Sequence, residues 1–135
     1  MIREYERRDF EAVKKIHEST QLDYKFPNLN DPLFVITKVY EHEDGVIRAC
    51  GGLYLQVETY LWLDKSNWAT PEHKLSVLQA LQIEGFTEAA IKGLKCAVLW
   101  LPPHMERFGD RLVSDLGWSR DRNDWISYSR ELGAT

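Results

Sequence analysis

The sequence predicts a single α/β domain in which helices pack on a mixed β-sheet. Segments with the apolar spacing of strands alternate with segments that have the spacing of helices along nearly the whole chain. The chain has 135 residues, of which 44% are hydrophobic and 28% charged, and this is the size and composition of one ordinary globular domain. We therefore expect one domain over residues 1–135.

The N-terminal region is predicted to form a short strand over residues 2–5, followed by a helix. Asp9 has a side chain suited to an N-cap, and Phe10, Val13 and Ile16 follow it at helical spacing. Residues 20–32 contain two prolines among asparagine and aspartate residues, which break regular structure. A loop or a short second helix is expected there.

An antiparallel hairpin is predicted over residues 33–41 and 46–57. Glu43-Asp44-Gly45 supplies the Asp-Gly signal of a tight turn between the two strands. Gly51-Gly52, in the middle of the second strand, indicates a β-bulge or a close approach by another backbone or a ligand. A further strand is expected over residues 59–64, after a turn or bend near residues 56–58.

A long helix is predicted to begin at Thr70-Pro71-Glu72 and to end at Gly93. Thr70 is a hydroxyl N-cap, Pro71 occupies the first helical position, and Glu72 lies near the positive end of the helix dipole. Glycine is the usual residue just beyond a helix end. One largely apolar face should cover a sheet, and its residues are Leu75, Leu78, Gln82, Phe86 and Ala89.

The last third of the chain predicts a strand, a helix and a final strand. Residues 96–101 form a continuous apolar run before Pro102-Pro103, which is typical of a buried, central, parallel strand. Residues 105–116 have helical spacing, and Gly117 follows them. Residues 125–132 alternate in polarity, as a strand with two unlike faces does.

Charge and composition exclude several classes of protein. The formal net charge of -4 argues against a general nucleic-acid-binding protein, which needs a basic surface for phosphates. No apolar run is long enough for a membrane span, and the charged N-terminal segment is unlike a signal peptide, so we expect a cytoplasmic protein. Cys50 and Cys96 lie in apolar runs and are predicted to be reduced, buried thiols.

The order of the predicted elements resembles that of the GNAT family of N-acetyltransferases. Three local features add to the resemblance: Ile2-Arg3-Glu4 before the first helix, the helix entry Thr70-Pro71-Glu72-His73-Lys74, and the helix end Leu116-Gly117-Trp118. The resemblance implies a three-layer domain whose sheet splays between its fourth and fifth strands and holds acyl-CoA in the gap. It further implies an N-acyltransferase that moves an acetyl or acyl group from acyl-CoA to an amine of a small molecule or a protein, with acetyl-CoA as the expected cofactor.

The same resemblance assigns candidate site residues. Glu58, Tyr60 and Asp64 lie on or beside the strand that would face the gap, where a carboxylate base could act directly or through water. The cofactor is expected along the same strand and at the start of the long helix. The residues concerned are Leu61, Trp62, Leu63, Thr70, His73, Lys74, Leu75 and Ser76.

Two departures from the family pattern support an alternative hypothesis. Leu75, Val77 and Gln79 stand where the family tends to have the glycines that let a pyrophosphate approach the backbone. Val113 stands where the family has a tyrosine that acts as general acid. The alternative is a non-catalytic GNAT-like binding module, and either form could be a monomer or a homodimer. Trp68, in a polar stretch, is predicted to be partly exposed and functional, or else to cap the core.

Overall fold

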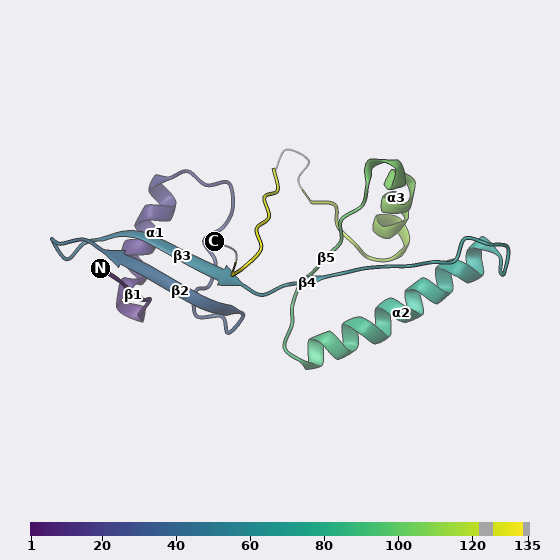
Figure 1. Cartoon of the computed structure of the whole chain (residues 1–135), viewed down its shortest axis with the longest axis horizontal. Coiled ribbons are helices and arrows are strands. Elements are labelled where there is room, and N and C mark those ends of the chain that lie inside the picture. Colours follow the sequence, from purple (N-terminus) through teal and green to yellow (C-terminus); the bar gives the residue numbers. More distant parts are fainter. Residues whose placement is uncertain (122–125, 134–135) are drawn as a thin grey trace.

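Two separate β-sheets organise the chain in the computed structural model, which describes residues 1–121 and 126–133 (Figure 1). Strands β1 (Ile2–Glu4), β2 (Phe34–Glu41) and β3 (Ile47–Tyr54) form an antiparallel sheet in the order β1-β2-β3. Strands β4 (Val57–Glu58) and β5 (Ala97–Val98) form a parallel pair. The chain thus has the predicted mixture of helices and strands, but the expected mixed sheet is divided in two within the described residues.

Helix α1 (Phe10–Ser19) covers one face of the three-stranded sheet. Val13 of the helix packs against Val39 and Ile47 of the sheet, and Val39 is only 1% exposed. Ile16 and Phe26 pack against this cluster from outside. The predicted N-terminal strand and the helical spacing of Val13 and Ile16 are confirmed, and residues 20–32 form a loop without a second helix.

Asp9 precedes α1 as predicted, but its carboxylate does not cap that helix. Asp9 ends a short 3-10 turn, η1 (Arg7–Asp9), and accepts a hydrogen bond from the Glu6 backbone N–H at 2.8 Å. Both of its oxygens also accept bonds from the Arg3 guanidinium, each at 2.8 Å. The bidentate bond to a guanidinium is stronger than a neutral cap, so Asp9 connects β1 to the turn instead.

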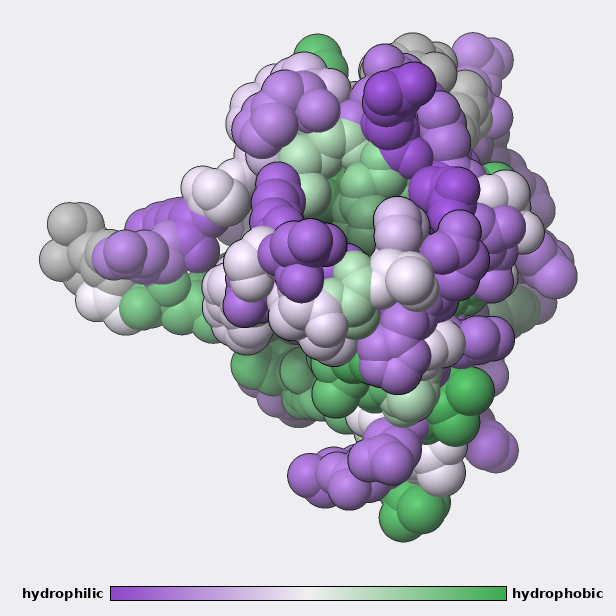
Figure 2. All heavy atoms as spheres, turned by 90° about the vertical axis from the view of Figure 1, so that its right-hand side faces the viewer, coloured by the Kyte–Doolittle hydropathy of each residue, from purple (hydrophilic) through white to green (hydrophobic). Residues whose placement is uncertain are grey.

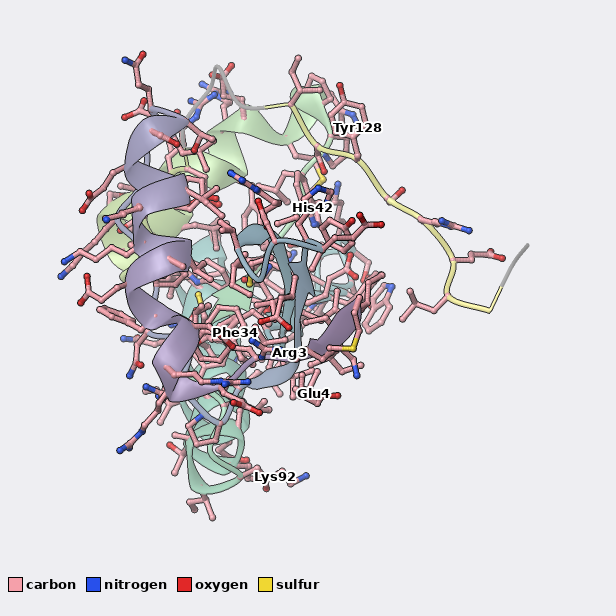
Figure 3. The ribbon with its side chains drawn as sticks, turned by 90° about the vertical axis from the view of Figure 1, so that its left-hand side faces the viewer. Arg3, Glu4, Phe34, His42, Lys92 and Tyr128 are labelled. Carbon is pink, nitrogen blue, oxygen red and sulfur yellow. The ribbon has the colours of Figure 1, made fainter. Side chains whose placement is uncertain are left out.

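The β2–β3 hairpin turns where the Asp-Gly signal places it. Gly45 has φ +79°, a conformation that favours glycine, and the Asp44 carboxylate accepts a bond from the Val46 N–H at 3.0 Å. Figure 3 views this half of the molecule with α1 along one side of the sheet.

The predicted bulge at Gly51-Gly52 is wrong. Gly51 and Gly52 pair regularly with Lys38 and Thr37, and the extra residues in the ladder are Val35 and Arg48. Glycine is needed at position 52 because a Cβ there would lie 3.1 Å from the Phe34 ring. The predicted close approach therefore exists at Gly52, and the group that approaches is the Phe34 side chain.

Residues 59–64 do not form the predicted strand. The Thr59 N–H donates to the Val98 carbonyl at 2.7 Å, and beyond this bond the segments that follow β4 and β5 are no longer paired. No neighbouring strand accompanies residues 60–64 in the part of the chain that the structure describes, so no ladder forms despite the β-favouring sequence. The bend expected near residues 56–58 is likewise replaced by β4 itself.

The boundaries of the long helix are confirmed. Helix α2 (Pro71–Ile91) begins after Thr70, whose hydroxyl accepts a bond from the His73 N–H, and Gly93 follows its end with φ +86°. The helix does not cover the three-stranded sheet. It runs away from that sheet, alongside the extended chain that follows β4 (Figure 1).

The segment around β5 is less buried than predicted. Only Ala97 and Val98 form the strand, both are half-buried, and Cys96 is exposed because a two-stranded sheet has no second layer around it. Cys50 is half-buried, and burial raises the pKa of its thiol. Both cysteines are free thiols.

The helix predicted after Pro102-Pro103 is confirmed. A 3-10 turn, η2 (Pro103–Met105), leads into α3 (Glu106–Asp115), and Gly117 follows with φ +77°. The final strand is not formed over residues 126–132, where the chain is irregular and exposed, and Trp125 lies outside the described residues. No helix in the described part of the chain has the length and apolar character needed to cross a bilayer.

Candidate functional site

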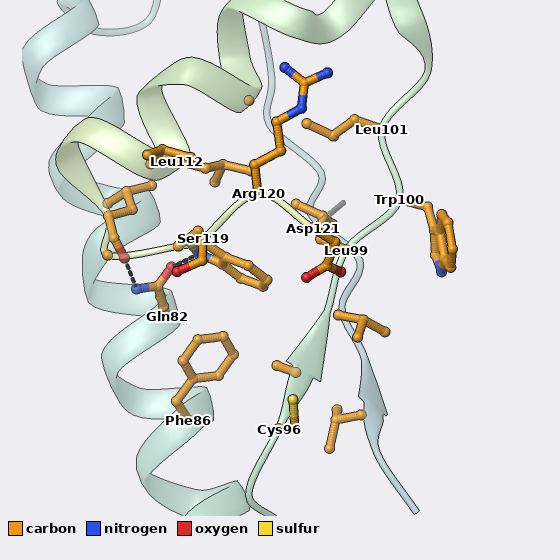
Figure 4. Close-up of a pocket in the computed structure, with 18 of the residues that line it drawn as sticks. Gln82, Phe86, Cys96, Leu99, Trp100, Leu101, Leu112, Ser119, Arg120 and Asp121 are labelled. Carbon is orange, nitrogen blue, oxygen red and sulfur yellow. Dashed lines mark hydrogen bonds between the residues drawn. The ribbon is translucent and has the colours of Figure 1, made fainter. Parts of the chain in front are cut away.

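A large cleft lies between α2, α3 and the segment around β5 (Figure 4). Its volume is about 1220 Å³. Its lining runs along β5, from Lys95 and Cys96 before the strand to residues 99–103 after its carboxyl end, the end of parallel strands where ligands usually bind. Figure 2, which views the end of the molecule containing α2 and α3, shows a hollow with an apolar floor and a hydrophilic rim. Its apolar walls include Phe86, Leu94, Leu99, Trp100, Leu101, Leu112 and Trp118.

Gln82 fixes the wall of this cleft. Its amide nitrogen donates to the Leu116 carbonyl at 2.9 Å, and its amide oxygen accepts a bond from the Trp118 indole N–H at 2.7 Å. The Trp118 ring also packs on Phe86, with centroids 5.7 Å apart. Since Gly117 lets the chain turn sharply after α3, one glutamine holds both the turn and the indole against α2.

Charged groups gather at the rim. Arg120 lies 3.5 Å from Glu106, and Lys95 lies 2.7 Å from Asp31, which is not part of the rim. The carboxylates of Asp110 and Asp121 also line the cleft. Figure 4 shows the Asp121 carboxylate directed into the space between α2 and β5, whereas Arg120 extends towards Leu101. The described part of the rim is therefore net negative.

Of the three predicted catalytic residues, Glu58 and Tyr60 come together and Asp64 does not join them. Glu58 ends β4, and Tyr60 stacks on Trp62 with ring centroids 5.8 Å apart. A hydrogen bond to the Glu58 carboxylate raises the pKa of Tyr60. Asp64 lies six residues beyond Glu58, a length of chain that spans at most roughly 20 Å, and its pKa is lowered chiefly by the Ser66 backbone N–H.

Part of the predicted cofactor set does form a cluster at the start of α2. The Trp68 indole N–H donates to the Asp64 carbonyl at 2.8 Å, and its ring packs edge-on against His73. The Lys74 ammonium lies 5.8 Å from the centre of the Trp68 ring and donates to the Ser66 carbonyl at 2.7 Å. This cluster holds the helix entry in place.

The first turn of α2 does not fit the pyrophosphate of a CoA. Pro71 has no N–H, and the N–H groups of His73 and Lys74 already bond the Thr70 hydroxyl and carbonyl. Glu72 places a carboxylate beside its own amide in the same turn. The remaining predicted residues offer no cation: Leu75 and Ser76 follow in the helix, and Leu61, Trp62 and Leu63 lie on the irregular segment.

The tryptophan prediction is only partly right. Trp68 is half-exposed as expected, but Trp62 is 83% exposed and Trp100 is also more exposed than Trp68. Sequence reasoning placed the site at the start of α2 and missed the rim residues Arg120 and Asp121. Pro102-Pro103 could have indicated this region, because the prolines mark where the predicted parallel strand ends. Ligands bind beyond the carboxyl ends of such strands.

Compared with family models, with curated proteins and with solved structures, the chain has no significant match in any of the three. Within the described residues, no cluster of three or more histidine, cysteine, aspartate or glutamate side chains could hold a metal ion. The function must therefore be inferred from the cleft itself.

Proposed function

We propose that this chain is a binding module with a GNAT-like order of elements, and that its cleft takes a small amine with an apolar body. The single observation that carries the proposal is the Asp121 carboxylate, directed into a cleft with apolar walls. An apolar pocket with a few convergent polar groups is the usual form of a small-molecule site.

The chemistry of the cleft supports a cationic head group. The charges of Arg120 and Lys95 are offset by Glu106 and Asp31, whereas Asp110 and Asp121 add negative charge at the rim. An ammonium is attracted to the exposed Asp121 carboxylate, while the apolar walls of the cleft contact the body of the ligand. Trp118 lines the same cleft, so its ring is available for cation–π attraction to this charge.

Calorimetric titration with 2-phenylethylamine and with 2-phenylethanol tests this proposal, since the two probes differ in charge and share their apolar body. We expect the amine to bind about tenfold more tightly. Asp121→Asn should remove this preference, whereas Asp115→Asn, on α3 but outside the cleft lining, should keep it. Equal affinities for both probes in the wild-type chain would contradict the proposal.

Acyl transfer to the bound amine is the second candidate function. The parting of β4 and β5 after the Thr59–Val98 bond favours it, because a splayed pair of strands is what the resemblance implies, and Glu58 and Tyr60 lie next to this point without lining the cleft. Tyr60, with its raised pKa, stays protonated at neutral pH, and Glu58 is the available base.

A combined assay separates the two functions. The protein is incubated with acetyl-CoA and 2-phenylethylamine, the released thiol is measured, and melting temperatures are recorded with acetyl-CoA and with free CoA. If the chain is a binding module alone, we expect no thiol release and no shift of the melting temperature with either form of CoA, because the His73 and Lys74 N–H groups in the first turn of α2 already have partners. Thiol release that Glu58→Gln abolishes would establish the transferase instead.

A further inference from the structure

The three-stranded sheet has an uncovered face opposite α1. Directly paired residues share one face of a sheet. The pairs Ile36–Leu53 and Ile2–Tyr40 therefore lie on the same side, and this is the side away from Val39 and the core. All four side chains are exposed, and Ile36 is 46% exposed.

This face is not a charged surface, and the described part of the C-terminal segment does not cover it. The face contains Lys38 and Glu4, which form an ion pair with each other and so leave little net charge. The segment that carries Tyr128 passes on the side of the sheet away from α1 (Figure 3), but Tyr128 is itself exposed, as are Ile126 and Leu132. The apolar face is thus left open to solvent.

Helix α2 has a matching second face. Ala80, Ile83, Thr87 and Ile91 recur at helical spacing on the side away from Gln82, with Glu84 as the charged residue on this side. Ile83 is 58% and Ile91 81% exposed. A helix with apolar residues on more than one side is normally buried on more than one side.

The exposed area is more than a stable dimer needs to bury. The chain exposes 11210 Å², whereas a compact protein of 15.8 kDa exposes about 7,300 Å². The excess is about 3,900 Å² per chain, or about 7,800 Å² for two chains, and obligate dimers bury roughly 2,000–5,000 Å² in total. A second copy of this chain can therefore cover a large part of the excess.

The structure keeps α2 away from the sheet of its own chain. Only Leu55 and Gln56 separate β3 from β4, and the Leu55 N–H donates to the Leu33 carbonyl at 2.8 Å. Lys95, just beyond α2, pairs with Asp31, which also accepts a bond from the Leu33 N–H. These contacts hold the C-terminal end of α2 beside the loop before β2, so that the helix points outwards (Figure 1).

We infer that two copies of this chain form a reciprocal dimer, in which the outer face of α2 of each copy packs on the uncovered face of the β1-β2-β3 sheet of the other. The arrangement is two-fold symmetric and closes on itself. The cleft between α2 and α3 stays open, because it lies on the opposite side of α2.

Sedimentation velocity of the full chain, over a range of concentrations, tests the inference. We expect a species of about twice 15.8 kDa. Ile36→Lys and Ile83→Asp should each raise the dissociation constant by roughly 30-fold or more, because a charge then enters the centre of the interface. Leu22→Asp, at an equally exposed position in the loop after α1, should leave the dimer intact.

A mixture of the two weakened variants gives the decisive result. In a dimer of one Ile36→Lys chain with one Ile83→Asp chain, one interface is wild-type and the other contains a lysine opposite an aspartate. The mixture should therefore regain the dimer that each variant alone has lost, which also shows that both variants fold. A monomeric wild-type chain, variants that remain dimeric, or a mixture that remains monomeric would each overturn the inference.

Discussion

The two halves of this chain are stabilised differently. In the N-terminal half, β2 and β3 each have eight residues and pair along their length, and α1 encloses a core around Val39. In the C-terminal half, β4 and β5 have two residues each, and the buried side chains are Leu78, Leu112 and Leu116.

The difference shows what each half requires. In the N-terminal core, a short turn with the correct residues sets the β2–β3 hairpin, and β1 and α1 then pack on it across the loop of residues 20–33. The C-terminal half depends on bonds between residues far apart in sequence, such as Gln82 and Trp118. Its stability should therefore respond more to single contacts and, in our proposal, to a second copy of the chain.

The largest effect should come from the core of the C-terminal half. Leu112→Ala should cost about 3 kcal/mol, because it leaves a cavity beneath α2 and α3. Val113→Ala is the matched control at an exposed position and should cost under about 0.5 kcal/mol. Denaturant unfolding followed by tryptophan fluorescence measures both. Equal losses would mean that the C-terminal half has no core of its own.

The buried ion pair of the N-terminal half should give the next largest effect. Asp9 is 4% exposed, and Asp9→Asn should cost about 2 kcal/mol because it weakens the bonds to Arg3 and to the Glu6 N–H. Asp115→Asn removes an exposed pair with Arg111 and should cost under about 0.5 kcal/mol. Chemical denaturation of both variants measures this difference.

The same pair makes stability depend on pH. The Arg3 guanidinium lowers the pKa of Asp9 below its ordinary value. The unfolded chain therefore binds a proton at a higher pH than the folded chain, and the contribution of Asp9 is present above about pH 4 and lost as the pH falls through the folded pKa. Asp9→Asn should remove this part of the acid dependence. An unchanged acid profile would show that the pair contributes nothing.

Gln82→Leu tests the long-range bonds of the C-terminal half. The change leaves the Trp118 N–H and the Leu116 carbonyl without their partner and should cost about 1.5 kcal/mol. It should also shift the fluorescence of Trp118, which Gln79→Leu on the exposed side of α2 should not do. A loss of stability without a change of fluorescence would show that Gln82 stabilises α2 without holding the Trp118 indole in place.

The smallest effect compares two neighbouring glycines of β3. Gly52→Ala forces the Phe34 ring to move, whereas a Cβ at Gly51 meets nothing within 4 Å. We expect Gly52→Ala to be about 1 kcal/mol less stable than Gly51→Ala. Thermal melting of both variants measures this, and equal melting temperatures would show that the Phe34 ring adapts freely.

Features written into a few consecutive residues could be predicted from the sequence. The Asp44-Gly45 turn, the Thr70-Pro71 start of α2 and the Gly93 and Gly117 helix ends are where the sequence places them. The candidate site could not be predicted in the same way. Its residues were expected together at the start of α2, but the structure leaves Asp64 apart from Glu58 and assembles Gln82, Trp118 and Asp121 instead.

By itself, the sequence determined which segments can be helix, strand or turn, because caps, glycines and apolar spacing act over one or two turns of chain. Tertiary structure alone decided whether a β-favouring segment has a neighbour. Residues 60–64 and 126–132 have the composition of strands, but a strand needs a partner for its backbone hydrogen bonds, and none lies beside them within the described chain. Tertiary structure also decided that Asp9 binds Arg3 rather than capping α1, since a bidentate ionic bond is stronger than a cap.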